Sequence, residues 1–102
     1  MLKPAFFPLS RVELKMTQPT KKTPSEKEIT AAKSWPIWEK EKSDFDWHYD
    51  SEETFLVLEG DVTVEYDDGE ISFGPGDMVT FPEGMDCKWH VKKKIRKHYN
   101  FK

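Results

Sequence analysis

The sequence predicts an all-β domain, an antiparallel jelly-roll β-barrel preceded by one short helix. From Trp35 onward the chain divides into short runs rich in β-branched and aromatic residues, with Gly, Pro and Asp between them, a pattern typical of short strands joined by turns. These runs leave no room for the helices that connect parallel strands. A length of 102 residues suits one core and is too short for two. A barrel of about eight short antiparallel strands is therefore expected.

The chain is expected to have two parts. Residues 1–22 are interpreted as an N-terminal extension that ends in a polar linker over residues 17–22, and residues 23–102 as the barrel domain. Residues 1–15 lack the long apolar run and cleavage site of a secretory signal. Three interpretations of them stay open: a flexible arm, an extension upstream of a start at Met16, or a first edge strand.

The barrel domain should begin with the helix. In Thr23-Pro24-Ser25-Glu26, a Thr N-cap, a Pro at the first helical position and a Glu three residues after the cap form a capping box. The Ala and Glu residues that follow favour two or three helical turns. The helix should end near Ser34, because Pro36 disfavours helix in the residue before it.

The remaining runs are expected to be strands joined mostly by tight turns. Gly60-Asp61 suits a two-residue hairpin turn, Asp67-Asp68-Gly69 a second hairpin turn, and residues 74–77 a loop. The predicted strands are residues 37–39, 45–49, 54–59, 62–66, 71–73, 78–81, 87–91 and 95–101.

Composition and charge exclude several classes of function. Sixteen basic and nineteen acidic residues give a net charge of −3, so a nucleic-acid partner is not expected. The basic run Lys92, Lys93, Lys94, Arg96 and Lys97 is interpreted as the solvated face of the last strand. No apolar stretch is long enough to cross a membrane. A single cysteine, Cys87, fits a reducing compartment, so a cytoplasmic protein is expected, with an organelle left open by residues 1–15.

Two spacings in the chain resemble the motifs of the cupin superfamily. Cupins carry a Glu followed after six residues by a Gly, and Glu53 and Gly60 have this spacing. They also carry a Gly followed after five residues by Pro-x-Gly and then, after two more residues, by a His. Here Gly76 is followed after five residues by Pro82-Glu83-Gly84 and then, after two more residues, by Cys87. The resemblance covers residues 22–102 and implies the cupin jelly roll.

The histidine positions of the motifs depart from the pattern. Counting back from Glu53 places His48 at the second motif histidine and Asp46 at the first, while Cys87 and Val91 stand for the His and Asn of the second motif. Among small single-domain cupins, the chain looks like the group of ureidoglycine aminohydrolase. The phrases that carry this likeness are Trp35-Pro36-Ile37-Trp38-Glu39, Leu58-Glu59-Gly60, Gly76-Asp77-Met78-Val79-Thr80-Phe81-Pro82 and Arg96-Lys97-His98-Tyr99.

Asp46, His48, Glu53 and Cys87 are the candidate metal ligands. Asp46 and His48 are two residues apart and share a face of an extended strand, and Cys87 shares its parity with Trp89. A site with one imidazole, one thiolate and two carboxylates favours zinc or iron over magnesium. Two alternatives stay open: Cys87 as a small buried hydrophobic residue, and a reversed face on which Trp47 and Tyr49 point inward and His48 lies on the surface.

The aromatic residues supply the candidate ligand pocket. Most of them must be core, because each buries a large apolar area, and the rest are expected to line the barrel and stack on a planar ligand. The pocket residues predicted are Trp38, Trp47, Tyr49, Phe55 and Trp89. Aromatic residues left on an outer sheet face would favour a homodimer, which the resemblance to small cupins also implies.

Three functions follow as hypotheses. The first is a cupin domain that binds a small molecule in its barrel, with or without a divalent metal. The second is a metal-dependent enzyme, either a hydrolase acting on a small nitrogen-rich compound or an oxygenase. The third is a metal-free structural or partner-binding module. The sequence assigns no reaction, because one fold hosts many functions.

Overall fold

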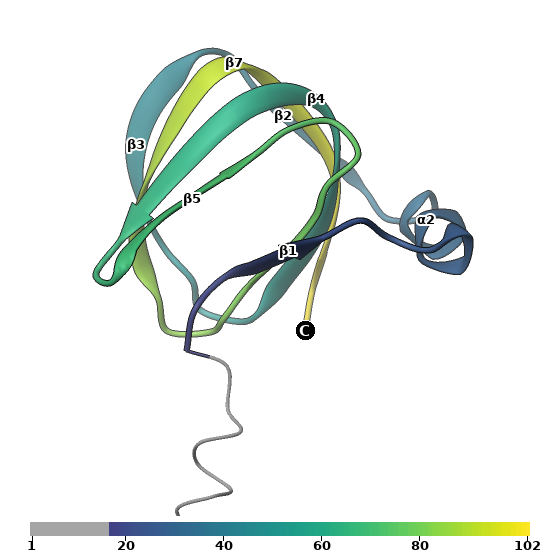
Figure 1. The fold of residues 1–102 in the computed structure, drawn as a ribbon, viewed down its shortest axis with the longest axis horizontal. Coiled ribbons are helices and arrows are strands. Elements are labelled where there is room, and N and C mark those ends of the chain that lie inside the picture. The colour runs from purple at the N-terminus through teal and green to yellow at the C-terminus, as the bar shows by residue number, and fades with distance from the viewer. Residues whose placement is uncertain (1–16) are drawn as a thin grey trace, which may run out of the picture.

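The computed structural model describes residues 17–102, so the three interpretations of residues 1–15 lie outside the described residues. Figure 1 shows a barrel of curved strands with one helix at its side. The elements are β1 (Thr20–Lys22), α2 (Glu26–Ala32), β2 (Ile37–Lys40), β3 (Ser43–His48), β4 (Glu53–Tyr66), β5 (Gly69–Phe73), β6 (Met78–Phe81) and β7 (Asp86–Phe101).

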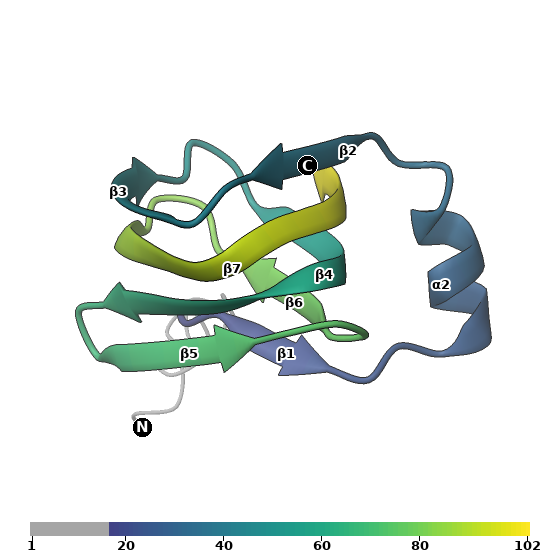
Figure 2. The same ribbon diagram turned by 90° about the horizontal axis from the view of Figure 1, so that it is seen from above.

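All strand pairs are antiparallel and belong to one sheet that curls into the barrel. The order is β1-β6-β4-β7-β2, with β3 also paired to β7 and β5 to β4. In Figure 2 the long strands β4 and β7 cross the molecule side by side, with β2 and β3 on one side and β5, β6 and β1 on the other. The predicted fold class, an antiparallel β-barrel with one short helix, is confirmed.

The predicted hairpin at Gly60-Asp61 is wrong. Residues 54–59 and 62–66 belong to the single strand β4, whose register on β7 shifts three times between Val57 and Val62. Such irregularities sharpen the bend of a strand, and Gly60 adopts a φ of 123° there. Residues 87–91 and 95–101 likewise join into β7. Two long bent strands, β4 and β7, thus replace the four short strands that were predicted.

The helix begins two residues later than predicted. Its N-cap is Ser25, whose Oγ accepts a hydrogen bond from Glu28 N at 3.2 Å, while Glu28 Oε1 accepts one from Ser25 N at 2.9 Å. This reciprocal capping box gives the backbone N–H groups of Ser25 and Glu28 their acceptors. Thr23 and Pro24 therefore precede the helix. Outside the barrel, the helix buries Ala32 against Leu56 and Met78.

The segment predicted as a linker contains a strand. Thr20–Lys22 pairs antiparallel with β6, placing Thr20 opposite Thr80. Its residues are polar and exposed, which is why their pattern did not indicate a strand. As a short, lysine-bearing edge, β1 protects the sheet from pairing with another molecule.

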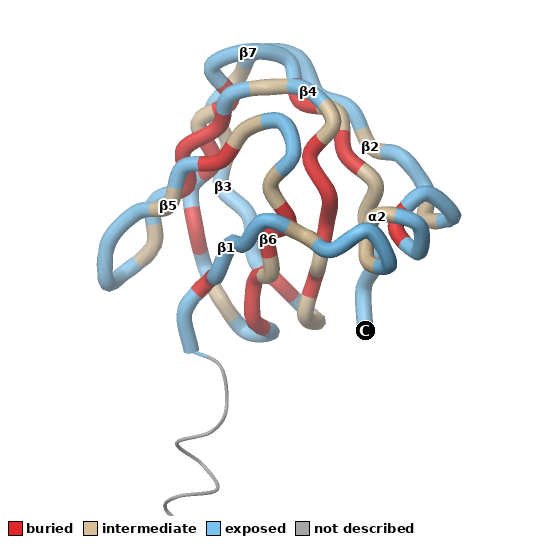
Figure 3. The backbone as a smooth tube through the Cα atoms, turned by 45° about the vertical axis from the view of Figure 1, so that its right-hand side comes forward, coloured by how far each residue is buried: buried red, intermediate tan, exposed pale blue. Residues whose placement is uncertain are grey.

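The core packs inside the barrel. Figure 3 shows buried residues alternating with exposed ones along the strands, as expected where one face of each strand lies inside. The largest fully buried side chains include Trp89, Tyr49, Phe55 and Phe81, whose rings pack with centroids 5.0–6.1 Å apart. Among the described residues, no helix has the length and apolar character needed to cross a membrane.

Candidate ligand-binding site

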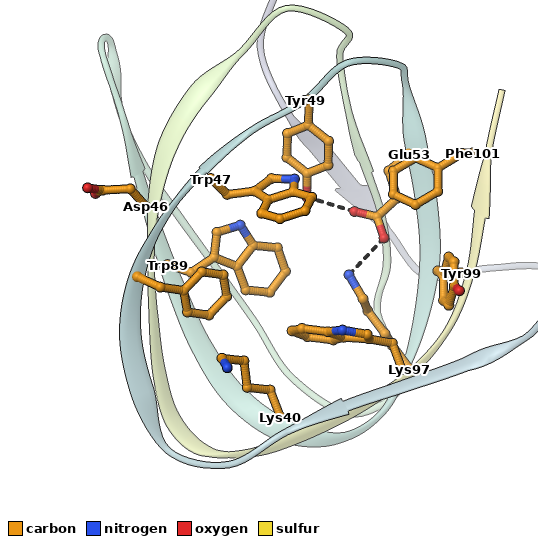
Figure 4. A pocket seen from close by; sticks show the side chains of 11 residues that line it. Lys40, Asp46, Trp47, Tyr49, Glu53, Trp89, Lys97, Tyr99 and Phe101 are labelled. Carbon is orange, nitrogen blue, oxygen red and sulfur yellow. Dashed lines mark hydrogen bonds and ion pairs between the residues drawn. The ribbon is translucent and has the colours of Figure 1, made fainter.

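The barrel also holds a cavity of about 450 Å³ beside this core (Figure 4). Strands β2, β3 and β7 supply most of its wall, and the start of β4 closes it. Four charged residues also line it, two basic and two acidic: Lys40, Lys97, Asp46 and Glu53. The aromatic residues of the wall are Trp38, Phe45, Trp47, Tyr49, Trp89, Tyr99 and Phe101.

A buried ion pair forms the inner end of the cavity. Lys97 Nζ donates to Glu53 Oε2 at 2.8 Å, and the hydroxyl of Tyr49 donates to Glu53 Oε1 at 2.7 Å. The side chains of Lys97 and Glu53 are only 5% and 3% exposed. Both carboxylate oxygens therefore have donors, and the ammonium has a counter-ion, as burial of charges requires.

Lys97 is also surrounded by aromatic rings. Its Nζ lies 4.0 Å from the ring centroid of Phe55, 4.8 Å from that of Trp89 and 4.9 Å from that of Trp38, and these faces attract a cation. Burial lowers the pKa of Lys97, and the carboxylate of Glu53 opposes this. Burial likewise raises the pKa of Tyr49, with the charge of Glu53 adding to the effect. Tyr49 therefore stays a neutral donor to Glu53 at physiological pH.

One polar atom of this wall has no partner. The indole Nε1 of Trp89 is buried and forms no hydrogen bond within the described residues. A buried donor left unsatisfied is unfavourable.

Four of the five predicted pocket residues line this cavity. Trp38, Trp47, Tyr49 and Trp89 line it, and Phe55 lies against Lys97 Nζ. Trp47 is 47% exposed, so it stands at the rim.

The predicted metal ligands are not brought together. Cys87 faces inward, but the register sets it opposite Trp47, while Asp46 faces Lys88 and His48 faces Asp86. Directly paired residues of antiparallel strands share a face of the sheet, so Trp47 points inward and Asp46 and His48 point outward. This is the reversed face that the sequence left open. Figure 4 shows the Asp46 carboxylate directed away from the cavity.

Each of the other candidate ligands has a different partner. His48 Nδ1 lies 2.7 Å from Asp86 Oδ1 on the surface, and Glu53 binds Lys97. The Cys87 thiol donates to Trp47 O at 3.6 Å, and burial raises its pKa to about 11, which disfavours the thiolate that a metal requires. No group of three or more His, Cys, Asp or Glu side chains in residues 17–102 could hold a metal ion. These four residues do not fit a divalent metal. Glu53 supplies the only inward carboxylate among them, and it is paired with the ammonium of Lys97.

Sequence reasoning missed Lys97, the central residue of the cavity. The basic run predicts a solvated face for Lys97, but only its neighbours lie on that face. There, Lys94 Nζ lies 3.4 Å from Glu39 Oε1, and Arg96 Nε lies 3.0 Å from Glu39 Oε2. A signal was available, because Ile95, Lys97 and Tyr99 alternate with the residues of the outer face and so share the inward parity of the strand. Lys40, Phe45, Tyr99 and Phe101 were also missed as lining residues.

Comparison with known proteins identifies relatives of the whole domain. Residues 28–99 match the EutQ-like cupin domain family. A DUF861 family protein from Thermotoga maritima is 43% identical, with a TM-score of 0.79, over 83% of this chain and 100% of that protein. The comparison with curated proteins found no match.

More distant structures share the fold. The EutQ protein of Clostridium difficile is 23% identical with a TM-score of 0.60, over 64% of this chain and 52% of that protein. A cupin-2 domain protein from Shewanella frigidimarina is 19% identical with a TM-score of 0.53, over 89% and 87% of the two chains. The barrel is therefore of the cupin type.

Proposed function

Because the chain belongs to the EutQ-like cupin domain family, we propose that its barrel binds a small planar molecule between the aromatic walls of the cavity. The observation that carries this proposal is an aromatic cavity with a hydrogen-bonded ion pair at its inner end. Its volume of about 450 Å³ is within the range of small-molecule sites, which are mainly apolar with a few placed polar groups.

The charges of the cavity indicate what the ligand is like. The two buried charges, Lys97 and Glu53, neutralise each other, so a neutral ligand fits better than a polyanion such as a phosphate ester. An ammonium carries three N–H donors, and one of those on Lys97 goes to Glu53. The ligand should therefore present a carbonyl-type acceptor toward Lys97 and a flat face toward the tryptophans.

Tryptophan fluorescence tests the proposal. Benzamide, which is flat and neutral, should quench the emission saturably, because three of the four tryptophans line the cavity. Cyclohexanecarboxamide, with the same amide on a puckered ring, and phenyl phosphate, with a dianion, should bind more weakly. Trp47→Ala should weaken benzamide binding roughly tenfold, the loss expected from one stacked pair.

Trp35→Ala is the matched control for that variant. Trp35 packs beside α2 in the outer cluster, so its loss should leave benzamide affinity unchanged. Equal quenching by the planar and puckered amides, or equal losses in the two variants, would contradict binding between the aromatic walls.

The resemblance to ureidoglycine aminohydrolase supports a narrower form of the proposal. A ureido group is small, neutral and flat and carries a carbonyl oxygen, which matches the ligand described above. Hydantoin is the probe for this class and should compete with benzamide. Its competition would support the ureide class without assigning a reaction.

The metal hypothesis leads to a separate measurement. Because Asp46, His48, Glu53 and Cys87 do not converge, we expect protein purified without a chelating tag to hold far less than one zinc or iron per chain. Added Zn²⁺ should not raise the melting temperature. Near-stoichiometric metal in elemental analysis, lost in both His48→Ala and Cys87→Ala, would reverse this conclusion and revive the metal-dependent enzyme.

The predicted homodimer and the cytoplasmic location remain parts of the proposal. Trp47 and Phe101 are 47% and 45% exposed at the rim of the cavity, and Ile37 is 43% exposed on β2. In the proposed homodimer, the partner would cover some of these side chains. If no planar compound binds, a partner-binding module becomes the better interpretation.

A further inference from the structure

The position of Lys97 goes beyond what binding a neutral ligand requires. A surface lysine would suffice to donate a hydrogen bond, yet this one is 5% exposed and lies inside the barrel. Its Nζ points into the cavity toward Glu53 in Figure 4 and lies within 4.9 Å of the ring centroids of Trp38 and Trp89. Only a molecule that enters the cavity can reach it. Lysines in apolar pockets are the ones used as nucleophiles toward carbonyl compounds.

We propose that Lys97 forms a reversible Schiff base with a small planar aldehyde or ketone bound in the cavity. This inference rests on the proposed function and names its ligand class. Glu53 Oε2, 2.8 Å from Nζ, takes one proton from the ammonium, and the free amine attacks the carbonyl carbon. The C–N bond forms as the C=O π bond breaks, and one proton moves from the attacking nitrogen to the oxygen to give a neutral carbinolamine.

The second half of the reaction returns the proton. Glu53 protonates the carbinolamine hydroxyl, which leaves as water while the C=N bond forms. The sum is one ammonium and one carbonyl giving one protonated imine and one water, without change in charge or oxidation state. Hydrolysis by the reverse path releases the ligand.

The surroundings of Lys97 suit both the ammonium and the imine. Each carries one positive charge at the same nitrogen, beside Glu53 and within 4.0–4.9 Å of three aromatic centroids. The cation is thus stabilised before and after condensation. Burial also lowers the pKa of Lys97, which eases loss of the proton. Tyr49 holds the other oxygen of Glu53 and keeps the carboxylate oriented.

Reductive trapping tests the proposal on the full chain. The protein is incubated at neutral pH with benzaldehyde and sodium cyanoborohydride, which delivers hydride to the imine carbon and fixes a benzyl group on the nitrogen. Peptide mass mapping should find Lys97 benzylated at least about tenfold faster than the exposed Lys92 and Lys93, because the cavity concentrates and orients the aldehyde.

Two variants and one probe separate the outcomes. Lys97→Arg keeps the charge and should abolish the fast labelling, whereas Lys94→Arg, at an exposed lysine of the same strand that does not line the cavity, should leave the labelling of Lys97 unchanged. Benzyl alcohol, which has no carbonyl, should quench tryptophan fluorescence without forming an adduct.

Each result has a definite meaning. Labelling of Lys97 no faster than that of Lys92, together with quenching by benzyl alcohol, would overturn the Schiff base and leave the proposed binding function standing. If neither compound quenches or labels, both proposals are overturned. Fast labelling of wild-type Lys97 supports the Schiff base even if Lys97→Arg fails to fold.

Discussion

Glu53→Ala should lower the free energy of unfolding by about 3–5 kcal/mol, because it leaves a buried charge without its counter-ion. Lys97 Nζ reaches Glu53 Oε2 at 2.8 Å, and both side chains are at most 5% exposed. The variant also leaves the Tyr49 hydroxyl without its acceptor. The three aromatic faces around Nζ attract the cation, but they are weaker partners than a carboxylate.

Urea denaturation followed by circular dichroism measures the loss. The control is Glu39→Ala, which breaks the exposed contacts with Lys94 and Arg96. Exposed ion pairs contribute little, so the urea midpoint of this variant should stay near that of the wild type. Equal urea midpoints for Glu53→Ala and Glu39→Ala would show that burial of the Lys97 ammonium does not require the carboxylate of Glu53.

The double variant Glu53→Gln with Lys97→Met sharpens the test. It removes both charges, fills the space of the lysine stem and keeps an acceptor for Tyr49. Replacement of a whole buried pair is often nearly neutral, so stability should return to within about 2 kcal/mol of the wild type. Such a recovery with loss of benzaldehyde labelling would indicate that the pair is retained for its chemistry and not for stability.

The sequence predicted the barrel well because its strands are amphipathic and its turns are chemically distinct. Residues 78–81 and the hairpin at Asp67-Asp68-Gly69 were correct since both depend on local signals. Gly60-Asp61 was misassigned for a physical reason. A tight hairpin and a bulge in a long strand can both place a Gly at a positive φ, and only the partner strand distinguishes them.

The site was harder to predict because it depends on pairing across the chain. Shifting a strand by one residue exchanges its two faces, so the register of β3 on β7 decided between His48 and Trp47. Lys97 lies in a basic run, but its partner Glu53 is 44 residues away. The basic composition of the run favoured an exposed position for Lys97, whereas the alternation of β7 favoured a buried one. The carboxylate of Glu53 makes burial of the Lys97 ammonium possible.

Gly60→Ala should be severe, because the bend of β4 leaves no room for a side chain. A Cβ at Gly60 would lie 2.8 Å from both Ile95 Cα and Lys94 O, which are backbone atoms and cannot rotate away. The φ of 123° adds strain of about 1–3 kcal/mol for any other residue. We expect a total loss of at least about 3 kcal/mol in the free energy of unfolding, strain and overlap together.

Gly76→Ala separates the strain from the overlap. Gly76 also has a positive φ, 91°, but a Cβ there would meet nothing within 4 Å. Its loss should be about 1–2 kcal/mol, measured by the same urea titration. Because Gly60 packs against the part of β7 that leads into Lys97, Gly60→Ala should also weaken benzamide binding, whereas Gly76→Ala should not. Similar effects of the two variants would mean that the close approach of β4 and β7 does not position the ligand cavity.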